Sequence, residues 1–379
     1  MSLTVLMGCS ADSEPETSEM KTAAVEVEVA SFVTGYEADG ANGADEANGT
    51  NREYGAYESN RAWAIPSGFV AYGDGIQPIG IAFTQDSKTP RIGSFFKSGD
   101  KWRTDLENIE AGSYQLYGYI PHLTSIDYSI TDYDGGATDE EKNASYSTGA
   151  IMTLQNVPTV MPNDLCVVIG AKDGTDKEND SGLRQGDFNF TASANKDYVF
   201  LLFDHLYAAL RIQMKVHADY AALRTIKLKS LQLDTQAGEK KTTKKTTITI
   251  KLKANDGSAS PIEKLTFTPT GEEINGGLEF WSDTYGEQLT TEFKPFIGHF
   301  MPSGITKLIL TSTYDVYDTK GNLIRQDCKA TNTMVLKDLL TEQTITERGK
   351  RYTVNMTIHP TYLYMLSEPD LDNPTVTIN

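Results

Sequence analysis

The residue with the most distinctive chemical setting is Cys9, a thiol near the start of the chain. The apolar residues 3–7 lead into Gly8 and then Cys9, and the chain becomes polar from Ser10 onward. A small residue and a cysteine at the end of an apolar run form the box at which bacteria acylate a thiol and remove the preceding signal. We therefore expect lipidation of Cys9, with palmitate among the acyl groups. Because the basic leader and long apolar core of a full signal are incomplete, residues 1–21 are expected to hold a signal remnant and a linker.

The remaining chemistry-bearing residues form no catalytic motif. None of the histidines has the close spacing of a zinc motif; they stand at His122, His205, His217, His299 and His359. His205 could be drawn as half of a catalytic pair, but a strand histidine held by hydrogen bonds is the more frequent arrangement. The sequence has no nucleophile elbow and no glycine-rich phosphate loop. It therefore predicts a protein that is not an enzyme, with no catalytic residue, no cofactor and no metal ligand.

Two short charged stretches have weaker functional interpretations. Asp176, Glu178 and Asp180 alternate as in a calcium loop, but the glycine comes one position late, at Gly182, and flanking helices are not expected. Residues 240–245 are Lys-Lys-Thr-Thr-Lys-Lys, a basic cluster in an acidic chain. We expect this cluster to solvate a hairpin and guard an edge strand against unwanted pairing. Contact with an acidic neighbour or host surface is the alternative.

Charge and length restrict the class of protein. The chain has 379 residues, a formal net charge of −18 and a sequence pI of about 4.7. An acidic surface repels a phosphate backbone, so no nucleic-acid partner is expected. No run approaches the roughly 20 apolar residues of a membrane-spanning helix, so membrane attachment would depend on the lipid at Cys9. A chain of this length predicts about two domains.

Alternating apolar and polar residues predict β-strands through most of the chain. Such alternation places successive side chains on opposite faces of a sheet. The clearest examples span residues 25–33, 225–233 and 246–252. Shorter strands are predicted over residues 80–83, 114–119, 199–203, 209–216, 307–314, 332–336 and 352–358, and short helices only over residues 219–223 and 336–340. This pattern predicts an all-β protein of two tandem β-sandwiches.

The boundary between the two predicted sandwiches is placed near Lys196. The N-terminal sandwich is predicted over residues 22–196 and the C-terminal sandwich over residues 197–379. Within the first, a strand over residues 23–36 precedes a flexible loop over residues 37–60, which is rich in Gly, Ala and Asn. Exposed loops of this composition are open to proteases. The first strand could therefore be cut free from the body with which it pairs.

The two cysteines after Cys9 are expected to be reduced. Cys166 lies in the apolar run 165–169, where cysteine most often acts as a small buried hydrophobic residue. Cys328 follows 162 residues later, which permits one long-range disulfide without requiring it. Free, buried thiols are the first prediction, and a bridge between Cys166 and Cys328 is the alternative.

Several features, in order along the chain, resemble the fimbrillin (major-type pilin) lipoproteins of Bacteroidetes. The box at Cys9 and the strand over residues 25–33 come first, and aromatic-rich stretches follow over residues 94–96, 101–102 and 112–121. Residues 199–210, Val-Phe-Leu-Leu-Phe-Asp-His-Leu-Tyr-Ala-Ala-Leu, are similar to the Phe-x-His-x-x-x-x-Leu strand of fimbrillin-like chains. Together these features cover most of the chain, although each is a soft pattern.

The resemblance implies a fold, a location and a mode of assembly. Fimbrillins fold as two transthyretin-like β-sandwiches and reach the outer membrane as lipoproteins, and a surface protease then cuts behind an arginine in the loop after the first strand. A strand from the next subunit fills the opened groove, so the implied partners are other pilin subunits, outer-membrane lipid and a surface ligand of host or bacterium. Arg61, followed by Ala62, matches the processing site better than Arg52. No processing at either arginine is the remaining alternative.

The C-terminal residues 361–379 are a candidate donor strand. Two short strand-like runs, residues 362–366 and 374–378, flank an acidic stretch. Their apolar side chains could enter pockets of a neighbouring subunit, or they could pack back on their own sandwich as closing strands. Because tip subunits of the family have no free donor, a tip or accessory role is also open.

An outer-membrane glycan-binding lipoprotein with tandem β-sandwiches is the alternative from a different class of function. Such proteins stack sugars on exposed aromatic rings, and the chain has Trp63, Trp102 and Trp281 besides 19 tyrosines. Core packing is the more frequent fate of a tryptophan in a sandwich. A pair of rings facing solvent would favour glycan binding, whereas buried rings and a detachable first strand would favour a pilin.

Overall fold

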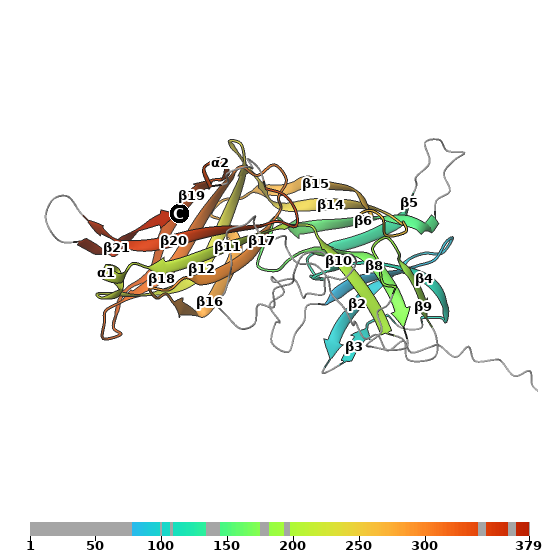
Figure 1. The fold of residues 1–379 in the computed structure, drawn as a ribbon, viewed down its shortest axis with the longest axis horizontal. Helices are drawn as coiled ribbons and strands as arrows, with labels where there is room; N and C mark the ends of the chain where they lie inside the picture. Colours follow the sequence, from blue (N-terminus) through green and yellow to red (C-terminus); the bar gives the residue numbers. More distant parts are fainter. Residues whose placement is uncertain are drawn as a thin grey trace, which may run out of the picture.

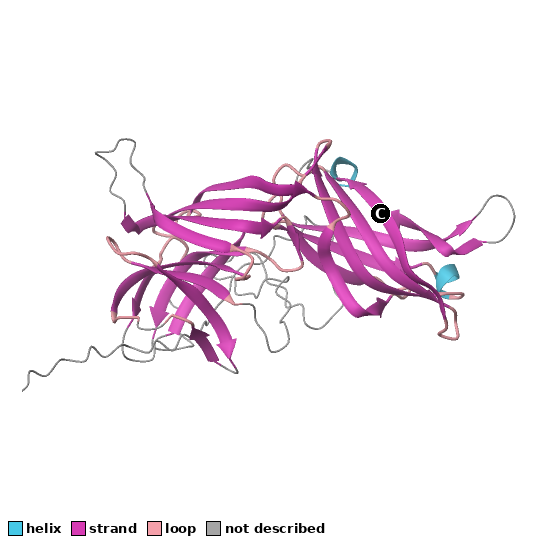
Figure 2. Cartoon of the chain, turned by 180° about the vertical axis from the view of Figure 1, so that it is seen from behind, coloured by secondary structure: helices cyan, strands magenta, loops and turns pink. Residues whose placement is uncertain are grey.

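Almost all of the ordered structure consists of β-strands (Figure 2). The computed structural model describes residues 78–98, 101–106, 109–133, 145–174, 182–192, 198–339, 346–362 and 369–378. Within these ranges the two helices are single turns, α1 (Ala218–Ala221) and α2 (Leu336–Leu339). The all-β prediction is confirmed. The first predicted strand and its loop, residues 23–60, lie outside the described residues.

The first of two packed bodies joins a seven-stranded sheet to a four-stranded sheet (Figure 1). The larger sheet has the order β10-β8-β4-β1-β2-β3, with β9 paired to β4, and the smaller has the order β15-β14-β6-β5. The strands are β1 (Ile79–Thr84), β2 (Arg91–Ser98), β3 (Lys101–Thr104), β4 (Gly112–Ile120), β5 (Asp127–Tyr133), β6 (Ser145–Pro158), β8 (Cys166–Gly174), β9 (Asn189–Ala192), β10 (Tyr198–His205), β14 (Thr243–Lys253) and β15 (Ile262–Glu273). We call this body the first sandwich.

The second sandwich contains two sheets of five strands each. One has the order β21-β20-β11-β17-β7, and the other has the order β13-β12-β18-β19 with β16 paired to β12. The strands are β7 (Val160–Met161), β11 (Ala208–Val216), β12 (Thr225–Ala237), β13 (Lys240–Lys241), β16 (Leu278–Gln288), β17 (Lys294–Phe300), β18 (Lys307–Tyr317), β19 (Leu323–Val335), β20 (Arg351–Tyr362) and β21 (Pro369–Ile378). A single apolar core lies between these two sheets. The tandem transthyretin-like form of the two bodies stays a prediction.

The alternating sequence explains which faces are buried. In β14, Ile248, Ile250 and Leu252 are fully buried, while the intervening residues are partly exposed. The same period places Leu231 and Leu233 of β12 in the second core. Each predicted strand after residue 78 lies within a strand of the structure, except that residue 336 begins α2. Alternation therefore identified strands such as β12 and β14 because one face of each meets a core.

Strand pairing crosses the boundary predicted at Lys196. Strands β14 and β15 belong to the second half of the sequence, yet β14 pairs with β6 (Figure 1). The apolar side chains of β14 belong to the core of the first sandwich. In the opposite direction, β7 pairs with β17 of the second sandwich. A linear division into residues 22–196 and 197–379 therefore does not separate the two bodies. The reason is that pairing partners are selected by long-range contacts, which local composition does not encode.

The seven-stranded sheet is apolar on both faces. Ala82, Tyr117 and Tyr119 face the four-stranded sheet and belong to its shared core. A separate buried cluster includes Ile79, Ile81 and Phe83 of β1 with residues from β2, β4, β8, β9 and β10 of the same sheet. In a strand, Ile81 and Ala82 point to opposite faces. An antiparallel sheet often leaves one face to water, but this one requires cover on both.

The C-terminal tail pairs within its own chain. Strand β21 lies antiparallel to β20 at the edge of its sheet, with Met356 opposite Ile378 and His359 opposite Thr375. Leu371, Val376 and Ile378 are only partly buried against the second core. Of the two arrangements considered for residues 361–379, the structure therefore has the closing strand.

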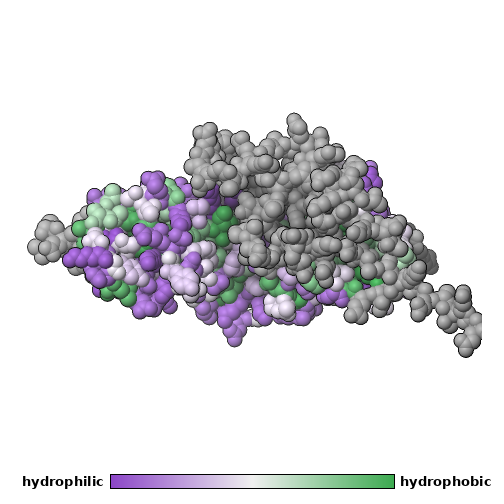
Figure 3. All heavy atoms as spheres, turned by 90° about the horizontal axis from the view of Figure 1, so that it is seen from below, coloured by the Kyte–Doolittle hydropathy of each residue, from purple (hydrophilic) through white to green (hydrophobic). Residues whose placement is uncertain are grey.

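The outer surface is mostly hydrophilic where the second sandwich is visible in Figure 3, with apolar residues in separate patches. Large apolar side chains that are exposed include Leu223, Tyr285, Phe293 and Leu323. Among the described residues, no helix has the length and apolar character needed to cross a bilayer.

Candidate functional site at the junction of the two sandwiches

Three chemistry-bearing residues meet where the chain passes between the two bodies. Asp164 and Cys166 lie on the segment that leaves β7 of the second sandwich and enters β8 of the first. His205 ends β10, just before the chain returns to the second sandwich as β11. The antiparallel register places His205 directly opposite Cys166. Pairing of β8 with β10 therefore brings together residues about 40 positions apart.

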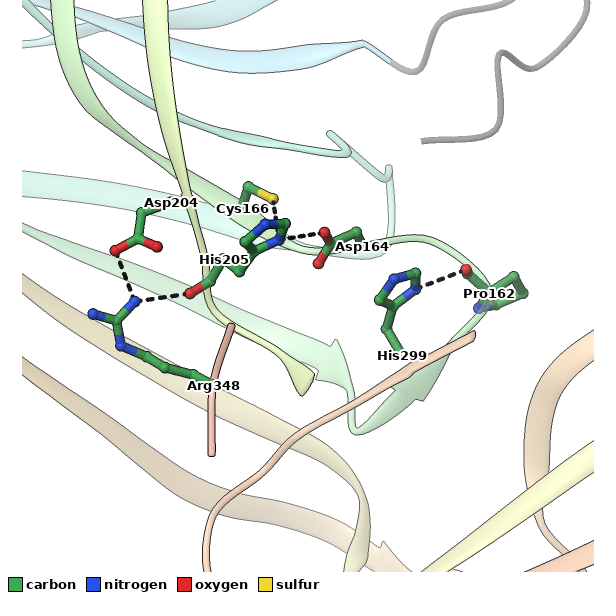
Figure 4. Close-up of polar contacts among 7 residues, drawn as sticks. All are labelled: Pro162, Asp164, Cys166, Asp204, His205, His299 and Arg348. Atoms are coloured by element: carbon green, nitrogen blue, oxygen red, sulfur yellow. Dashed lines mark hydrogen bonds and ion pairs between the residues drawn. The ribbon is translucent and has the colours of Figure 1, made fainter. Parts of the chain in front are cut away.

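The three side chains form a buried polar cluster (Figure 4). The Nδ1 atom of His205 lies 2.5 Å from Oδ2 of Asp164 and 3.5 Å from Sγ of Cys166. Exposure of the three residues is 1% for Asp164, 0% for Cys166 and 2% for His205. Apolar neighbours on β8 and β10, such as Val167 and Phe203, exclude water from the surroundings. Buried polar groups of this kind must be satisfied by one another.

A second histidine lies on the other side of Asp164 (Figure 4). His299, on β17, is fully buried, and its Nδ1 donates a hydrogen bond to the carbonyl oxygen of Pro162 at 3.0 Å. Burial lowers the pKa of His299, and the nearby Asp164 carboxylate only partly opposes that effect. His299 is therefore held in its neutral form with the proton on Nδ1, which places the ring lone pair on Nε2.

Arg348 joins the two bodies beside the cluster. Its Nη1 donates to Oδ2 of Asp204 at 2.8 Å and to the carbonyl oxygen of His205 at 3.0 Å (Figure 4). Arg348 comes from the segment before β20 of the second sandwich, whereas Asp204 belongs to β10 of the first. The backbone N–H of Gly349 donates to the carbonyl of Tyr207 at 2.9 Å. These bonds fix the chain at the point where it leaves the first sandwich.

The cluster is not arranged as a nucleophilic triad. In such a triad, the nucleophile and the carboxylate contact opposite nitrogens of the imidazole. Here the Cys166 sulfur and the Asp164 carboxylate both contact Nδ1 of His205. Burial and the nearby Asp164 carboxylate also raise the pKa of the Cys166 thiol well above its ordinary value, whereas a reactive cysteine requires a lowered pKa and access to solvent.

The other predicted site residues have separate positions. Cys9, Arg52, Arg61 and Ala62 lie outside the described residues. The side chain of His205, the one histidine that could be drawn as half of a catalytic pair, bonds to Asp164. The sequence does show Asp164 and Cys166 two positions apart at the start of an apolar strand. Their spacing alone does not show that they contact His205, about 40 residues away.

Both of the later cysteines are free thiols, so no disulfide joins them. Cys166 is buried as predicted, whereas Cys328 is only half-buried on the edge strand β19. The prediction of reduced thiols is confirmed, and the prediction of burial holds for Cys166 alone. The difference arises because β19 exposes most of its side chains to solvent.

The basic cluster over residues 240–245 divides between the two bodies. Lys240 and Lys241 form β13, which makes a hairpin with β12 around Gly238, a residue with φ of +65°. Lys244 is the second residue of β14, and its Nζ forms an ion pair with Oε2 of Glu272 on β15 at 3.1 Å. The predicted hairpin is confirmed, and β13 is an edge strand. Within the candidate calcium stretch, only residues 182–187 are described, and Asp187 there lies 3.5 Å from Arg184.

No family model and no curated protein matches the chain. The chain is similar to Bacteroides fimbrial and adhesion proteins. A proposed cell adhesion protein from Bacteroides fragilis NCTC 9343 is 10% identical, with a TM-score of 0.38, over 94% of this chain and 97% of that one.

Two further solved structures are similar at the same level. A proposed cell adhesion protein from Bacteroides uniformis ATCC 8492 is 12% identical, with a TM-score of 0.36, over 80% of this chain and 90% of that one. A fimbrial protein from Bacteroides vulgatus ATCC 8482 is 14% identical, with a TM-score of 0.30, over 79% of this chain and 91% of that one. At these TM-scores the likeness decides neither the domain arrangement nor the function of this chain.

Proposed function

We propose that the chain is a fimbrial structural subunit or adhesin that assembles by strand exchange. In this proposal it is exported as a lipoprotein acylated at Cys9 and held at the cell outer membrane. Proteolysis at Arg61–Ala62, or alternatively after Arg52, then removes the first strand. Its partners are other subunits of the fimbria, outer-membrane lipid and a ligand on a host or bacterial surface.

The observation that carries the proposal is the position of β21. This strand pairs with β20 alone and lies at the edge of its sheet. Its apolar side chains Leu371, Val376 and Ile378 are partly buried, in contrast to the buried Met356 and Ile358 of β20. An edge strand exposes unpaired backbone donors and acceptors on its outer side and can be exchanged for the equivalent strand of another chain. The tail can therefore serve as its own closing strand before assembly and as a donor afterwards.

The second apolar face of the seven-stranded sheet supports the other half of the exchange. Ile79, Ile81 and Phe83 carry large apolar side chains on a face that requires cover. We place the predicted strand over residues 23–36 against this body as part of that cover. Its removal would expose an apolar slot together with unpaired backbone groups, and each of these costs free energy in water. A donated strand would satisfy both.

The junction between the sandwiches suits a load-bearing subunit. The chain passes between the bodies from β6 to β7, from β7 to β8, from β10 to β11, from β13 to β14 and from β15 to β16. Tension applied to one body is therefore shared by several backbone connections. The Arg348 bond to Asp204 adds a charge-assisted contact at the same place.

Limited proteolysis with an arginine-specific protease tests the processing step. We expect a cut after Arg61, loss of the N-terminal fragment by intact mass, and growth into oligomers by size-exclusion chromatography. The Arg61→Ala variant should stay uncut and monomeric, and Arg52→Ala is the matched control that should still be processed. Deletion of residues 369–379 should leave cleavage intact and abolish oligomer growth. Cleavage without any change in assembly would contradict strand exchange and favour a tip or accessory role.

The glycan-binding alternative depends on where the tryptophan rings point. Trp281 packs edge-on against Phe296, with ring centroids 4.6 Å apart, and contacts the second core. It therefore serves the core and not an exposed sugar platform. The side chains of Trp63 and Trp102 lie outside the described residues. A glycan array with the uncleaved protein tests this alternative directly.

A further inference from the structure

We propose that Asp164, Cys166 and His205 form a zinc site at the junction of the two sandwiches. Each residue offers one ligand atom, and the three atoms all lie within 4.8 Å of one another. A carboxylate oxygen, a thiolate sulfur and an imidazole nitrogen are the three ligand types that proteins use for zinc. All three residues are buried, so the site would be closed to solvent, as structural zinc sites are.

The distance between the sulfur and nitrogen ligand atoms matches that of a tetrahedral zinc site, and the distance between the oxygen and nitrogen ligand atoms is shorter. Zinc binds sulfur at about 2.3 Å and nitrogen at about 2.0 Å, so these two ligands stand about 3.5 Å apart. The distance from Sγ of Cys166 to Nδ1 of His205 is 3.5 Å. A carboxylate oxygen and a nitrogen on zinc stand about 3.3 Å apart, whereas Oδ2 of Asp164 lies 2.5 Å from the same nitrogen. Entry of the ion would need a shift of less than about 1 Å by the Asp164 carboxylate.

Charge balance favours a divalent cation in this position. A thiolate and a carboxylate carry two negative charges, which neutralise the ion in surroundings where an unbalanced charge is costly. Binding of zinc by the Cys166 thiolate would release the thiol proton to solvent.

His299 lies outside the group of three ligand atoms that approach within 4.8 Å of one another. Its ring lies on the opposite side of Asp164 from His205 (Figure 4). Its Nδ1 atom donates to the Pro162 carbonyl at 3.0 Å. His299 would therefore be a neighbour of the metal ligands and not one of them. The site would join the segment between β7 and β8 to the end of β10.

The inference is independent of strand exchange, and its test uses the full chain. The protein is stripped with a chelator, returned to Zn²⁺ or Co²⁺, and examined by elemental analysis and absorption spectroscopy. We expect one tightly held zinc per chain, a higher melting temperature with zinc, and a thiolate-to-cobalt absorption band. Cys166→Ser should lose that band and weaken zinc binding by more than about 100-fold. Cys328→Ser is the matched control and should retain both.

Two results would overturn the zinc site. The first is a wild-type chain that is folded by circular dichroism and takes up no stoichiometric zinc. This result would overturn the site even if the Cys166 variant failed to fold. The partly exposed rings of His217 and His359, whose centroids lie 4.7 Å apart, offer an adventitious surface site. Zinc that is lost in His217→Ala and retained in Cys166→Ser would assign the metal to that surface pair.

Discussion

Substitution of Val376 on β21 tests whether β21 is a closing strand that can detach or a permanent strand of its sheet. Val376 lines a small internal cavity of the second sandwich together with Ile358 of β20, so the two side chains share one environment. Val376 is partly buried, whereas Ile358 is 4% exposed. Full burial of the two carbons removed by Val→Ala is worth about 1.6 kcal/mol at about 0.8 kcal/mol per methylene. Half burial predicts a loss of about 0.8 kcal/mol for Val376→Ala.

The matched change on β20 should cost much more. Ile358→Ala removes a buried side chain and enlarges the cavity that it lines, for which about 2–5 kcal/mol is typical. Urea unfolding monitored by circular dichroism measures both losses from the shift in midpoint at constant slope. Equal losses for the two variants would refute the argument, because β21 would then be as firmly packed as β20. In that case the tail would be a permanent strand and not a donor.

Two further predictions concern the body to which a segment belongs and the charge of a buried histidine. Ile250→Ala on β14 should destabilise the first sandwich by about 2–5 kcal/mol. Hydrogen exchange should then be faster in β4 and β6 but unchanged in β18. Faster exchange in β18 alone would mean that residues 243–253 belong with the second sandwich. The pKa of His299 is lowered in the folded chain, so on acidification the unfolded chain binds a proton at this histidine before the folded chain does. The free energy of unfolding therefore falls as the pH drops below about 6.5. In urea unfolding at pH 7.5 and pH 5.5, His299→Gln should show a smaller loss of stability on acidification than the wild type, and an unchanged loss would show that His299 is not the group responsible.

Some strands were not predicted from the sequence because their environment weakens the pattern. In β15 (Ile262–Glu273), four residues are partly buried and the other eight are exposed, so apolar alternation is faint. Strand β16 is interrupted by register shifts where it pairs with β12, which breaks the two-residue period. Strand β6 is long and pairs with both β5 and β14 through a further irregularity. Apolar alternation is therefore clearest where one face of a strand meets a core without interruption.

Local sequence patterns also do not predict which residues meet in the candidate site. Cys166 and His205 each lie on a strand whose apolar character is evident, and burial of Cys166 follows from its neighbours. Their contact depends on the pairing of β8 with β10, and the approach of His299 depends on the pairing of β17 with β7. Register and sheet order are properties of the whole chain, so the spacing of histidines along the sequence contained no sign of the cluster.

The sequence by itself determined the all-β class, about half of the strand positions, the apolar setting of Cys166 and the acidic character of the chain, because alternation, local apolar content and charge are properties of short segments. Only the tertiary structure decided that β14 and β15 return to the first sandwich, that β21 closes its own sheet, and that Asp164, Cys166 and His205 meet. Each of these depends on pairing between residues distant in sequence, and the stability of such a pair is set by the packing of both faces and not by either strand alone.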